Sequence, residues 1–387
     1  MSARTIDAEN TALENTSPET TAPRNVIANL DFEETWRRHQ GAPARTLPRE
    51  VLRRLAEAGS LLRVFATDRD RLVLPGPLDP LRLGEGPRPT IIESRNAAAL
   101  AGPTLYWGTP PDAVTPGAVA TSTNDDTNTP LRDRVWGWPS PTAESVAWAN
   151  HRGGAHELAA MLGVRSPESA IVRDPADVAD ADWVRSGAEW VVKAPWSAAG
   201  RDRVRGEGVP EEATMRSLTR LLESEGEGFL ERWQKRGADF GTCAVVLERG
   251  PHYAGAHRLV VDRPGHFLGI DVPAELPGTD ARLLTEVTLG VGTLLHDRGY
   301  RGPYSVDAFR TEGGTMHPLI EINARFSFGW VARAWAESLG PRPDSVFRLR
   351  VGEAANSAAP GPIVLLAGAT PDAPATITAG WEERERP

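Results

Sequence analysis

Hydrophobic and polar residues recur along the chain with two different periods, which predicts a mixture of helices and strands. The clearest helical period runs through residues 280–298, where apolar side chains return every three to four residues. These side chains are Leu283, Val287, Val291 and Leu294 or Leu295. Gly299 follows the stretch and is typical of a helix C-terminus. We therefore expect one long amphipathic helix here, packed on a sheet.

In the N-terminal third, stretches typical of strands alternate with stretches typical of helices. Strands are expected at residues 25–31, 61–65, 90–93 and 104–108, and helices at 32–39, 48–59 and 94–101. This alternation predicts a parallel, Rossmann-like sheet. The sequence has no GxGxxG motif, so we do not expect a dinucleotide site.

The central and C-terminal parts are predicted to be richer in antiparallel strands. Helices are expected at 141–162, broken by Gly153 and Gly154, and at 174–182, 216–226 and 331–338. Strands are expected at 190–193, 228–233, 242–249, 257–262, 266–271 and 363–366. The three strands between 242 and 271 are short and separated by Gly and Pro, which favours an antiparallel sheet.

Residues 304–310 and 319–323 have the pattern of two strands joined by a glycine-containing turn. Side chains alternate along a strand, so Glu321 and Asn323 share one face. If the turn closes the hairpin symmetrically, Asp307 lies opposite Glu321. Hard divalent cations such as Mg²⁺ prefer such oxygen donors, usually together with substrate phosphates. The hairpin is therefore a candidate metal site.

The sequence just after this hairpin also bears on its role. Arg325 lies two residues beyond Asn323 and carries a planar fork of donors suited to phosphate oxygens. The alternative is an ordinary hairpin whose polar face meets water. Phe326, Phe328 and Trp330 argue against that alternative, because such a run is too apolar for an open surface.

Composition excludes several classes of protein. The 387 residues are enough for two or three structural units. A net charge of -9 and a pI near 5.5 argue against nucleic acid or an anionic membrane as the main partner. No stretch approaches the roughly 20 apolar residues of a membrane span. Residues 1–23 lack the pattern of a signal peptide, so we expect a disordered tail and a cytoplasmic protein.

Two residue types are rare in this chain. The single cysteine, Cys243, excludes an intramolecular disulfide and a cysteine zinc site, and its apolar surroundings predict a buried thiol. Lys193 and Lys235 are the only lysines. Lys193 ends an apolar strand and precedes a loop of small residues whose amides can fold over phosphates, so it is a candidate phosphate ligand.

The sequences VDAF at 306–309 and IEINAR at 320–325, preceded by a Gly-Tyr-x-Gly-Pro-Tyr stretch from Gly299 to Tyr304, resemble the C-terminal half of the ATP-grasp superfamily. The resemblance covers about residues 150–333, with looser agreement before them. It implies an α/β (α+β) fold in which an N-terminal Rossmann-like domain precedes two α+β halves that clasp ATP. The implied divisions are 1–23 (tail), 24–140 (N-terminal domain), 141–230 and 231–352 (the two halves) and 353–387 (C-terminal extension).

The resemblance also implies roles for residues outside the hairpin. Lys193 would contact the α- or β-phosphate, and the loop from Ser197 to Gly200 would cover the β- and γ-phosphates. The main chain of Phe229 and Leu230 would pair with the adenine edge. The remaining implied positions are Glu231 for the ribose, Arg152 beside Asn150 for the α-phosphate, Asp239 for an acidic position of the site, and Glu248 and Arg258 for the cleft wall.

Two of these assignments have equally good alternatives. From the sequence alone, Glu231 can be an exposed carboxylate in a turn. Arg152 can be a residue on a solvated face of a helix. The sequence does not decide between these possibilities.

As an activity, the resemblance implies an ATP-dependent carboxylate–amine ligase that uses ATP and Mg²⁺ (or Mn²⁺). Asp307, Glu321 and Asn323 would hold the metal, while Lys193 and Arg325 stabilise charge in the transition state. A carboxylate would become an acylphosphate, which an amine or similar nucleophile attacks.

Two other activities stay open: a phosphotransferase acting on a small molecule, and a non-catalytic nucleotide-binding grasp domain. The expected partners are a small-molecule carboxylate and an amine, with a homodimer left open. Neither nucleic acid nor a membrane is expected as a partner.

Overall fold

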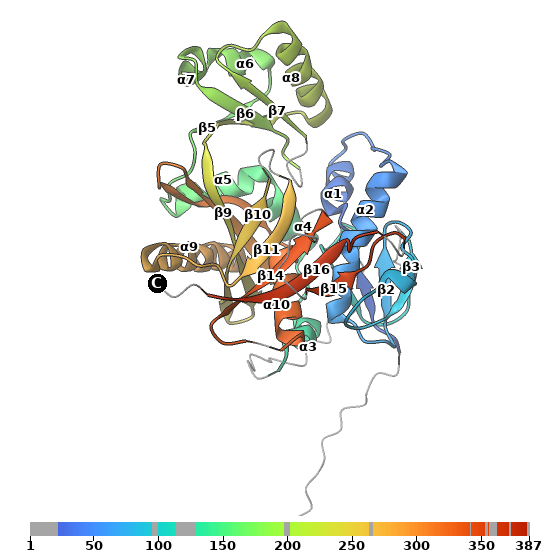
Figure 1. Cartoon of the computed structure of the whole chain (residues 1–387). Helices are drawn as coiled ribbons and strands as arrows, with labels where there is room; N and C mark the ends of the chain where they lie inside the picture. Colours follow the sequence, from blue (N-terminus) through green and yellow to red (C-terminus); the bar gives the residue numbers. More distant parts are fainter. Residues whose placement is uncertain are drawn as a thin grey trace, which may run out of the picture.

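The computed structural model describes residues 22–94, 100–113, 129–196, 202–262, 266–340, 342–352, 355, 362–370 and 373–384. Within these residues the strands form three sheets. Figure 1 shows a small helix-covered sheet standing above the large central sheet, with the N-terminal sheet and its helices beside it. The tail expected at 1–23 lies almost entirely outside the described residues, so that prediction is not tested.

The N-terminal sheet contains β1 (Asn25–Ile27), β2 (Arg71–Leu74), β3 (Thr90–Glu93) and β4 (Thr104–Tyr106) in the order β3-β2-β1-β4. All neighbouring strands are parallel, which confirms the predicted Rossmann-like arrangement. The helices of this part are α1 (Phe32–His39) and α2 (Arg49–Gly59), with the 3₁₀ turns η1 (Ser60–Phe65) and η2 (Pro80–Arg82).

One predicted strand of this part is wrong. Residues 61–65 form η1, in which every residue is buried, and the strand beside β1 is instead β2. A short apolar run fits a buried strand and a buried helical turn equally well, because its period does not distinguish them. Most of the helix expected at 94–101 lies outside the described residues.

Two helices lead from this part to the small sheet. They are α4 (Ala143–Asn150) and α5 (Arg152–Met161), preceded by α3 (Leu131–Arg134) and η3 (Val135–Gly137). A break was expected at Gly153 and Gly154, but the chain changes direction at His151. His151 is extended, with ψ at 133°, and its side chain accepts a hydrogen bond from the Gly153 amide at the start of α5.

The small sheet is antiparallel and has the order β5-β8-β6-β7. Its strands are β5 (Ser169–Val172), β6 (Glu189–Lys193), β7 (Arg203–Glu207) and β8 (Gly228–Arg232), and its helices are α6 (Pro175–Asp180), α7 (Asp182–Arg185) and α8 (Glu212–Glu225). Trp190, Val192 and Leu230 pack against Leu218 and Leu222 of α8, so this unit has a core of its own.

The large sheet has eight strands in the order β13-β12-β9-β10-β11-β14-β16-β15. They are β9 (Arg236–Leu247), β10 (Gly250–Val261), β11 (Phe267–Val272), β12 (Gly302–Thr311), β13 (Met316–Asn323), β14 (Ser345–Val351), β15 (Ile363–Leu366) and β16 (Ile377–Glu383). The long helix expected at 280–298 is α9 (Gly278–Asp297), and α10 (Phe328–Ser338) follows the predicted hairpin. None of the helices in the described residues has the length and apolar character needed to cross a bilayer.

The two faces of the large sheet carry different side chains. Tyr304 of β12 faces α9, where its hydroxyl donates a hydrogen bond to the Thr288 carbonyl at 2.8 Å. Since side chains alternate along a strand, Ser305 and Asp307 point to the opposite face. That opposite face carries the candidate site near β13, and α10 covers it further along.

The last strands tie the C-terminal part to the N-terminal sheet. The main chain of β15 pairs with Leu83 and accepts hydrogen bonds from the amides of Gly84 and Glu85 at 3.1 and 3.0 Å. The buried Arg63 guanidinium donates to the Leu365 carbonyl at 2.9 Å. β15 and β16, which lie in the stretch expected as an extension, thus form part of the large sheet, and β15 joins it to the N-terminal part.

Candidate active site

The predicted hairpin is present in the register that the sequence predicts. β12 and β13 are antiparallel, Asp307 lies opposite Glu321, and Ser305 lies opposite Asn323. The Asn323 amide nitrogen donates a hydrogen bond to Asp307 Oδ2 at 3.2 Å. Two carboxylates and an amide therefore share one face of the hairpin, as the alternation of side chains requires.

The electrostatics of the hairpin favour a bound cation. Desolvation between the strands, together with the negative charge of Glu321, raises the pKa of Asp307 to about 7. The positive charge of Arg325 and the hydrogen bond from Asn323 offset this only in part. A divalent cation would relieve the repulsion between the carboxylates, and its preferred oxygen ligands are the ones present here.

The protein supplies only part of a metal coordination shell at this hairpin. In the described part of the chain, no three His, Cys, Asp or Glu side chains are grouped as a metal site. Two carboxylates with one amide would leave positions for water and phosphate oxygens, which is how Mg²⁺ is commonly held with nucleotides. The residues therefore fit a metal that arrives with its substrate.

A chain of charged side chains connects this hairpin to the small sheet. Lys193, at the end of β6, contacts Glu231 of β8 with 2.5 Å between Nζ and Oε2. Arg152, at the start of α5, lies 3.8 Å from Glu231 Oε1 and 3.4 Å from Glu321 Oε2. His156 lies one turn further along α5, 3.7 Å from Glu231. Residues from four separate elements, α5, β6, β8 and β13, thus converge on one location.

The charges in this chain shift each other's pKa. Burial by itself would raise the pKa of Glu231, but the charge of Lys193, a hydrogen bond from His156 and the charge of Arg152 together lower it well below its usual range. The pKa of Lys193 is lowered, chiefly by burial and in part by Arg152, despite the opposing effect of Glu231. Glu231 is therefore ionised and buried, not the exposed turn residue that the sequence left open.

Arg152 is also buried rather than on a solvated helix face. Its amide donates to the Pro195 carbonyl at 3.1 Å and its Nε donates to the Ala194 carbonyl at 3.4 Å. Arg152 thus holds the segment just after Lys193 in place. The loop that follows, including Ser197 and Gly200, lies outside the described residues, so its expected contact with phosphates is not tested.

Arg325 has a partner that the sequence did not suggest. Its Nε and Nη2 both donate to Glu33 Oε1 of α1, at 2.9 and 2.5 Å. The rings of Phe32 and Trp107 lie 5.8 and 5.4 Å from its guanidinium carbon. Arg325 is therefore held between the N-terminal part and the hairpin in this structure, and a role toward phosphate would require it to leave Glu33.

Two further predicted positions lie on or beside this face. Asp239 of β9 lies opposite Phe309, on the face that carries Asp307, and accepts a hydrogen bond from Arg236 at 2.6 Å. The Asn150 side chain accepts a hydrogen bond from the Ala324 amide at 3.0 Å, which fixes the end of β13 against α4. Asp239 therefore lies on the same face as the hairpin carboxylate Asp307, and Asn150 holds the end of the hairpin in position.

The expected adenine contact at Phe229 and Leu230 is not compatible with the sheet. Both residues lie within β8, which has β5 on one side and β6 on the other. Their amides and carbonyls are used by these neighbours and are not free for a base. The connection from β8 to β9, residues 233–235, is the first main chain beyond the sheet and replaces them as a candidate.

The two expected cleft-wall residues do not lie on the site face. Arg258 pairs with Phe240, whose side chain packs against Leu284 of α9, so it belongs to the opposite face. Glu248 lies in the exposed turn at the far end of β9, where it is 3.7 Å from Arg301. The resemblance therefore does not predict on which face these two side chains lie.

Sequence reasoning missed Glu33, His156 and Arg236 as members of the site. Glu33 and Arg325 are 292 positions apart, and His156 has no motif around it. One clue was present in the sequence. Arg152 and His156 are four residues apart on one helix, and residues at this spacing lie on the same face.

Comparisons with known proteins agree with this architecture. No family model matches the chain. A "[Butirosin acyl-carrier protein]--L-glutamate ligase" from Niallia circulans is 24% identical over 140 residues, which is 35% of this chain and 33% of that protein. The chain thus matches about a third of the length of this curated relative.

Solved structures extend the likeness to most of the chain. The N5-carboxyaminoimidazole synthetase of Staphylococcus aureus superposes with a TM-score of 0.55 over 94% of both chains, at 10% identity. Its complex with ADP gives a TM-score of 0.50, covers 86% of this chain and 82% of that one, and is 11% identical. Together with the hairpin and the three sheets, these superpositions show that the chain has the ATP-grasp fold.

Proposed function

We propose that this protein is an ATP-dependent ligase that activates a carboxylate as an acylphosphate and joins it to an amine, with release of ADP. The observation that carries the proposal is the chain of contacts from Lys193 through Glu231 and Arg152 to Glu321. It connects the small sheet to the carboxylates of the hairpin, where a triphosphate and its metal would lie between them. The names of the relatives, a ligase and a synthetase solved with ADP, support the same reaction class.

Each residue of the site has a distinct task in this reaction. Asp307, Glu321 and Asn323 would hold Mg²⁺ or Mn²⁺, which would supply positive charge to offset that of the phosphates. Once ATP is present, Lys193 would contact a phosphate with its positive charge. Arg152 would then remain as the positively charged partner of Glu231. The site needs no general base for the first step, since a carboxylate is already a nucleophile.

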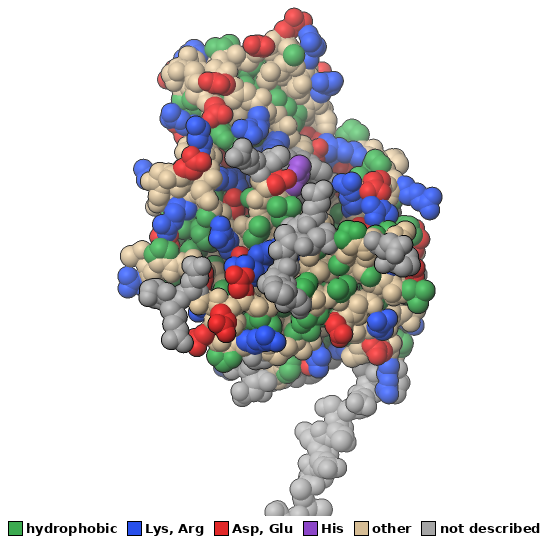
Figure 2. Space-filling view, in the orientation of Figure 1, with side chains coloured by type: hydrophobic (Ala, Val, Ile, Leu, Met, Phe, Trp, Pro, Cys, Tyr) green, Lys and Arg blue, Asp and Glu red, His purple; other side chains and the backbone are tan. Residues whose placement is uncertain are grey.

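The surface charge (Figure 2) argues against nucleic acid as a substrate, and the name of one relative points to an amino acid. On the face shown in Figure 2, acidic and basic side chains are interspersed over the described residues, without the broad basic surface that nucleic acid would need. One relative's name contains L-glutamate and an acyl-carrier protein. We therefore infer that amino acids are the first substrates to test, both as the acid and as the amine.

The test is ADP release with a panel of amino acids and carboxylic acids, with and without Mg²⁺. We expect release that depends on both an acid and an amine and that stops in EDTA. Glu321→Gln should lower it by about 100-fold or more, because it removes a charge from the metal site. Glu286→Gln, an exposed carboxylate on α9, is the matched control and should retain full activity.

Other outcomes would redirect the proposal. ADP release that needs an alcohol and yields no amide would indicate a phosphotransferase. Binding of MgADP without any turnover would indicate a non-catalytic nucleotide-binding protein. Full activity in Glu321→Gln would contradict the proposed role of the hairpin.

A further inference from the structure

A cavity lies on the α10 face of the large sheet, away from the acidic hairpin. Its volume is about 630 Å³, within the range of small-molecule sites, and it is lined by residues of α10, α3, β9, β10, β14 and β16. Gly241 of β9 lies opposite Asp307, whereas Val245 of the same strand lines the cavity. At about 3.4 Å per residue, the cavity begins roughly 14 Å from the hairpin along β9. We call it the α10 pocket.

The side chains around this pocket carry a positive excess, although the whole chain has a net charge of -9. Four arginines line it, Arg134, Arg333, Arg342 and Arg384, against the two carboxylates Glu337 and Asp344. Glu337 already accepts a hydrogen bond from the Leu131 amide at 2.6 Å. In the described part of the chain, none of the four arginines forms an ion pair. A negatively charged occupant would balance this charge.

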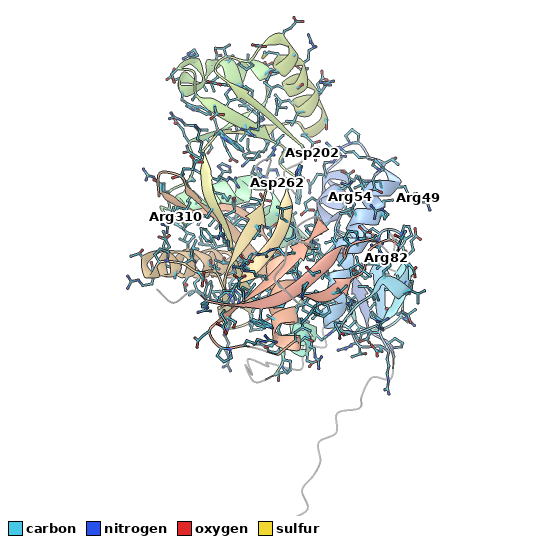
Figure 3. The ribbon with its side chains drawn as sticks, viewed as in Figure 1. Arg49, Arg54, Arg82, Asp202, Asp262 and Arg310 are labelled. Carbon is cyan, nitrogen blue, oxygen red and sulfur yellow. The ribbon has the colours of Figure 1, made fainter. Side chains whose placement is uncertain are left out.

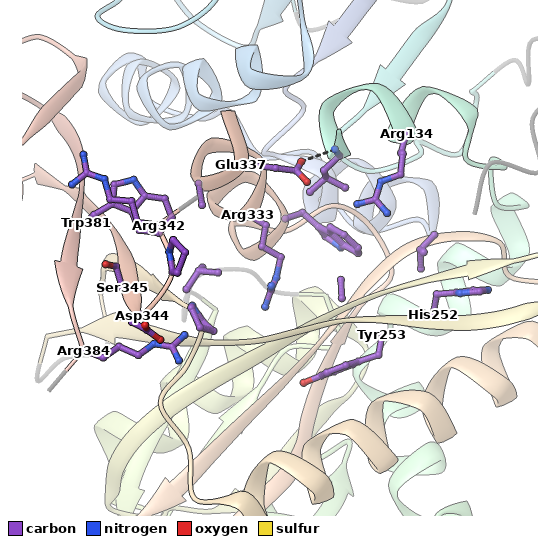
Figure 4. A pocket seen from close by; sticks show the side chains of 18 of the residues that line it. Arg134, His252, Tyr253, Arg333, Glu337, Arg342, Asp344, Ser345, Trp381 and Arg384 are labelled. Atoms are coloured by element: carbon purple, nitrogen blue, oxygen red, sulfur yellow. Dashed lines mark hydrogen bonds between the residues drawn. The ribbon is translucent and has the colours of Figure 1, made fainter. Parts of the chain in front are cut away.

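Arg333 is built into the pocket rather than loosely placed at its surface. Its Nη2 donates to the Ala256 carbonyl at 2.8 Å. It lies over Gly255, where a Cβ atom would approach Nη2 to 2.8 Å, and Gly255 has a positive φ of 122° next to a shift in strand register. The bulged strand and the missing side chain thus make the space for this guanidinium. Figure 4 shows Arg333 reaching from α10 toward the middle of the pocket, with Arg134 to one side and Arg384 to the other.

Three nitrogen atoms at the walls lack a hydrogen-bond partner within the described residues. They are Nε of Arg134, Nε of Arg333 and Nε1 of Trp381. Buried donors are nearly always satisfied, so such a group calls for an explanation. A carboxylate bound in the pocket would offer hydrogen-bond acceptors to these nitrogen atoms.

The rest of the wall is aromatic. Trp138, Trp330 and Trp381 line the pocket, and the rings of Trp138 and Trp330 pack edge to face with centroids 5.0 Å apart. Aromatic walls favour a flat apolar ligand, because they bury its area and offer ring faces for stacking. Inorganic anions such as phosphate would leave these walls exposed to water.

We propose that the α10 pocket binds a small organic anion with a flat apolar body, such as an aromatic carboxylate, at a site separate from the nucleotide site. The carboxylate would lie against Arg333 and Arg134, and the ring against the tryptophans. This inference does not depend on the ligase reaction, because it uses none of the residues assigned to ATP or metal.

The test is calorimetric titration of the full-length protein with 1-naphthoate. We expect saturable binding to one site and binding at least about tenfold weaker for the neutral isostere 1-naphthalenemethanol, since the charge is then lost. Arg333→Gln and Arg134→Gln should each weaken naphthoate binding by about tenfold as well. Saturation with MgADP should leave the affinity unchanged.

Controls separate loss of binding from loss of fold. Arg49→Gln removes an exposed arginine on the outer side of α2, as Figure 3 shows, and should bind as the unaltered protein does. Thermal unfolding of each variant shows whether it is folded, and Arg134→Gln serves if Arg333→Gln is not. Absence of saturable binding up to millimolar naphthoate, equal binding of the alcohol, or competition by MgADP would each overturn the proposal.

Discussion

The contact between Glu33 and Arg325 allows a quantitative test of how the N-terminal part is joined to the site. The two side chains are 12% and 10% exposed, and both guanidinium bonds go to a single carboxylate oxygen. Removing one partner of a fully buried pair costs about 3–5 kcal/mol, and the remaining exposure of this pair reduces that to about 2–3 kcal/mol. Glu33→Gln should therefore weaken the attachment of α1 by about that amount.

Hydrogen exchange of the α1 amides measures this attachment without requiring the whole chain to unfold as one unit. A loss of 2–3 kcal/mol corresponds to exchange about 30- to 150-fold faster in α1. Arg325→Gln should have an effect of similar size, and the double variant should be little worse than either single variant. The coupling energy from this cycle isolates the pair from the separate effect of Glu33 on the helix dipole.

Two results would refute the reasoning. One is exchange in α1 that changes less than about threefold in both single variants, a difference below 1 kcal/mol. The other is additivity in the double variant, which would mean that the two groups do not interact. Repeating the cycle with MgADP shows whether Arg325 stays on Glu33 or moves to a phosphate, since in the second case the coupling disappears.

Two further predictions concern the packing beneath α10. Burial and the charge of Arg333 lower the pKa of His257 to about 3. Below pH about 6.5 the unfolded chain binds a proton that the folded chain does not, so urea unfolding should show stability falling by up to about 1.4 kcal/mol per pH unit down to pH 3. His257→Asn should lack this component, and an unchanged slope would contradict it. Gly329→Ala would place a Cβ 2.8 Å from Cys243 Sγ and should cost about 1–3 kcal/mol, whereas Gly380→Ala, with no atom within 4 Å of its Cβ, should be tolerated. Equal urea midpoints for the two alanine variants would rule out the expected clash.

The hairpin was predictable because its information is local. Alternating side chains and a short glycine-containing turn set the register that brings Asp307 opposite Glu321, and both lie within 15 positions of each other. The same reasoning located the strand that contains Phe229 and Leu230. It did not show that β5 and β6 would occupy both of its edges, because strand neighbours are decided by contacts far along the chain.

Other errors have related physical causes. Residues 61–65 are apolar except for Arg63, so their pattern is too short and too uniform to distinguish a strand from a 3₁₀ helix. β16 reads ITAGWEE, with a glycine and two acidic residues, and gains its strand conformation from pairing with β14 and β15 rather than from its own sequence. Glu33, the partner of Arg325, lies on α1 in the N-terminal part, and no motif near Arg325 indicates this contact.

The pairing of β15 with residues 82–85 has a consequence for the order in which the protein can mature on the ribosome. Arg63 and the carbonyl of Leu365 that it contacts are 302 positions apart. Because residue 63 is synthesised before residue 365, the buried guanidinium lacks one of its acceptors until a further 302 residues have been added to the chain. The N-terminal sheet is therefore completed by a strand that is translated much later, so nascent chains should depend on β15 for the final packing of residues 63–85.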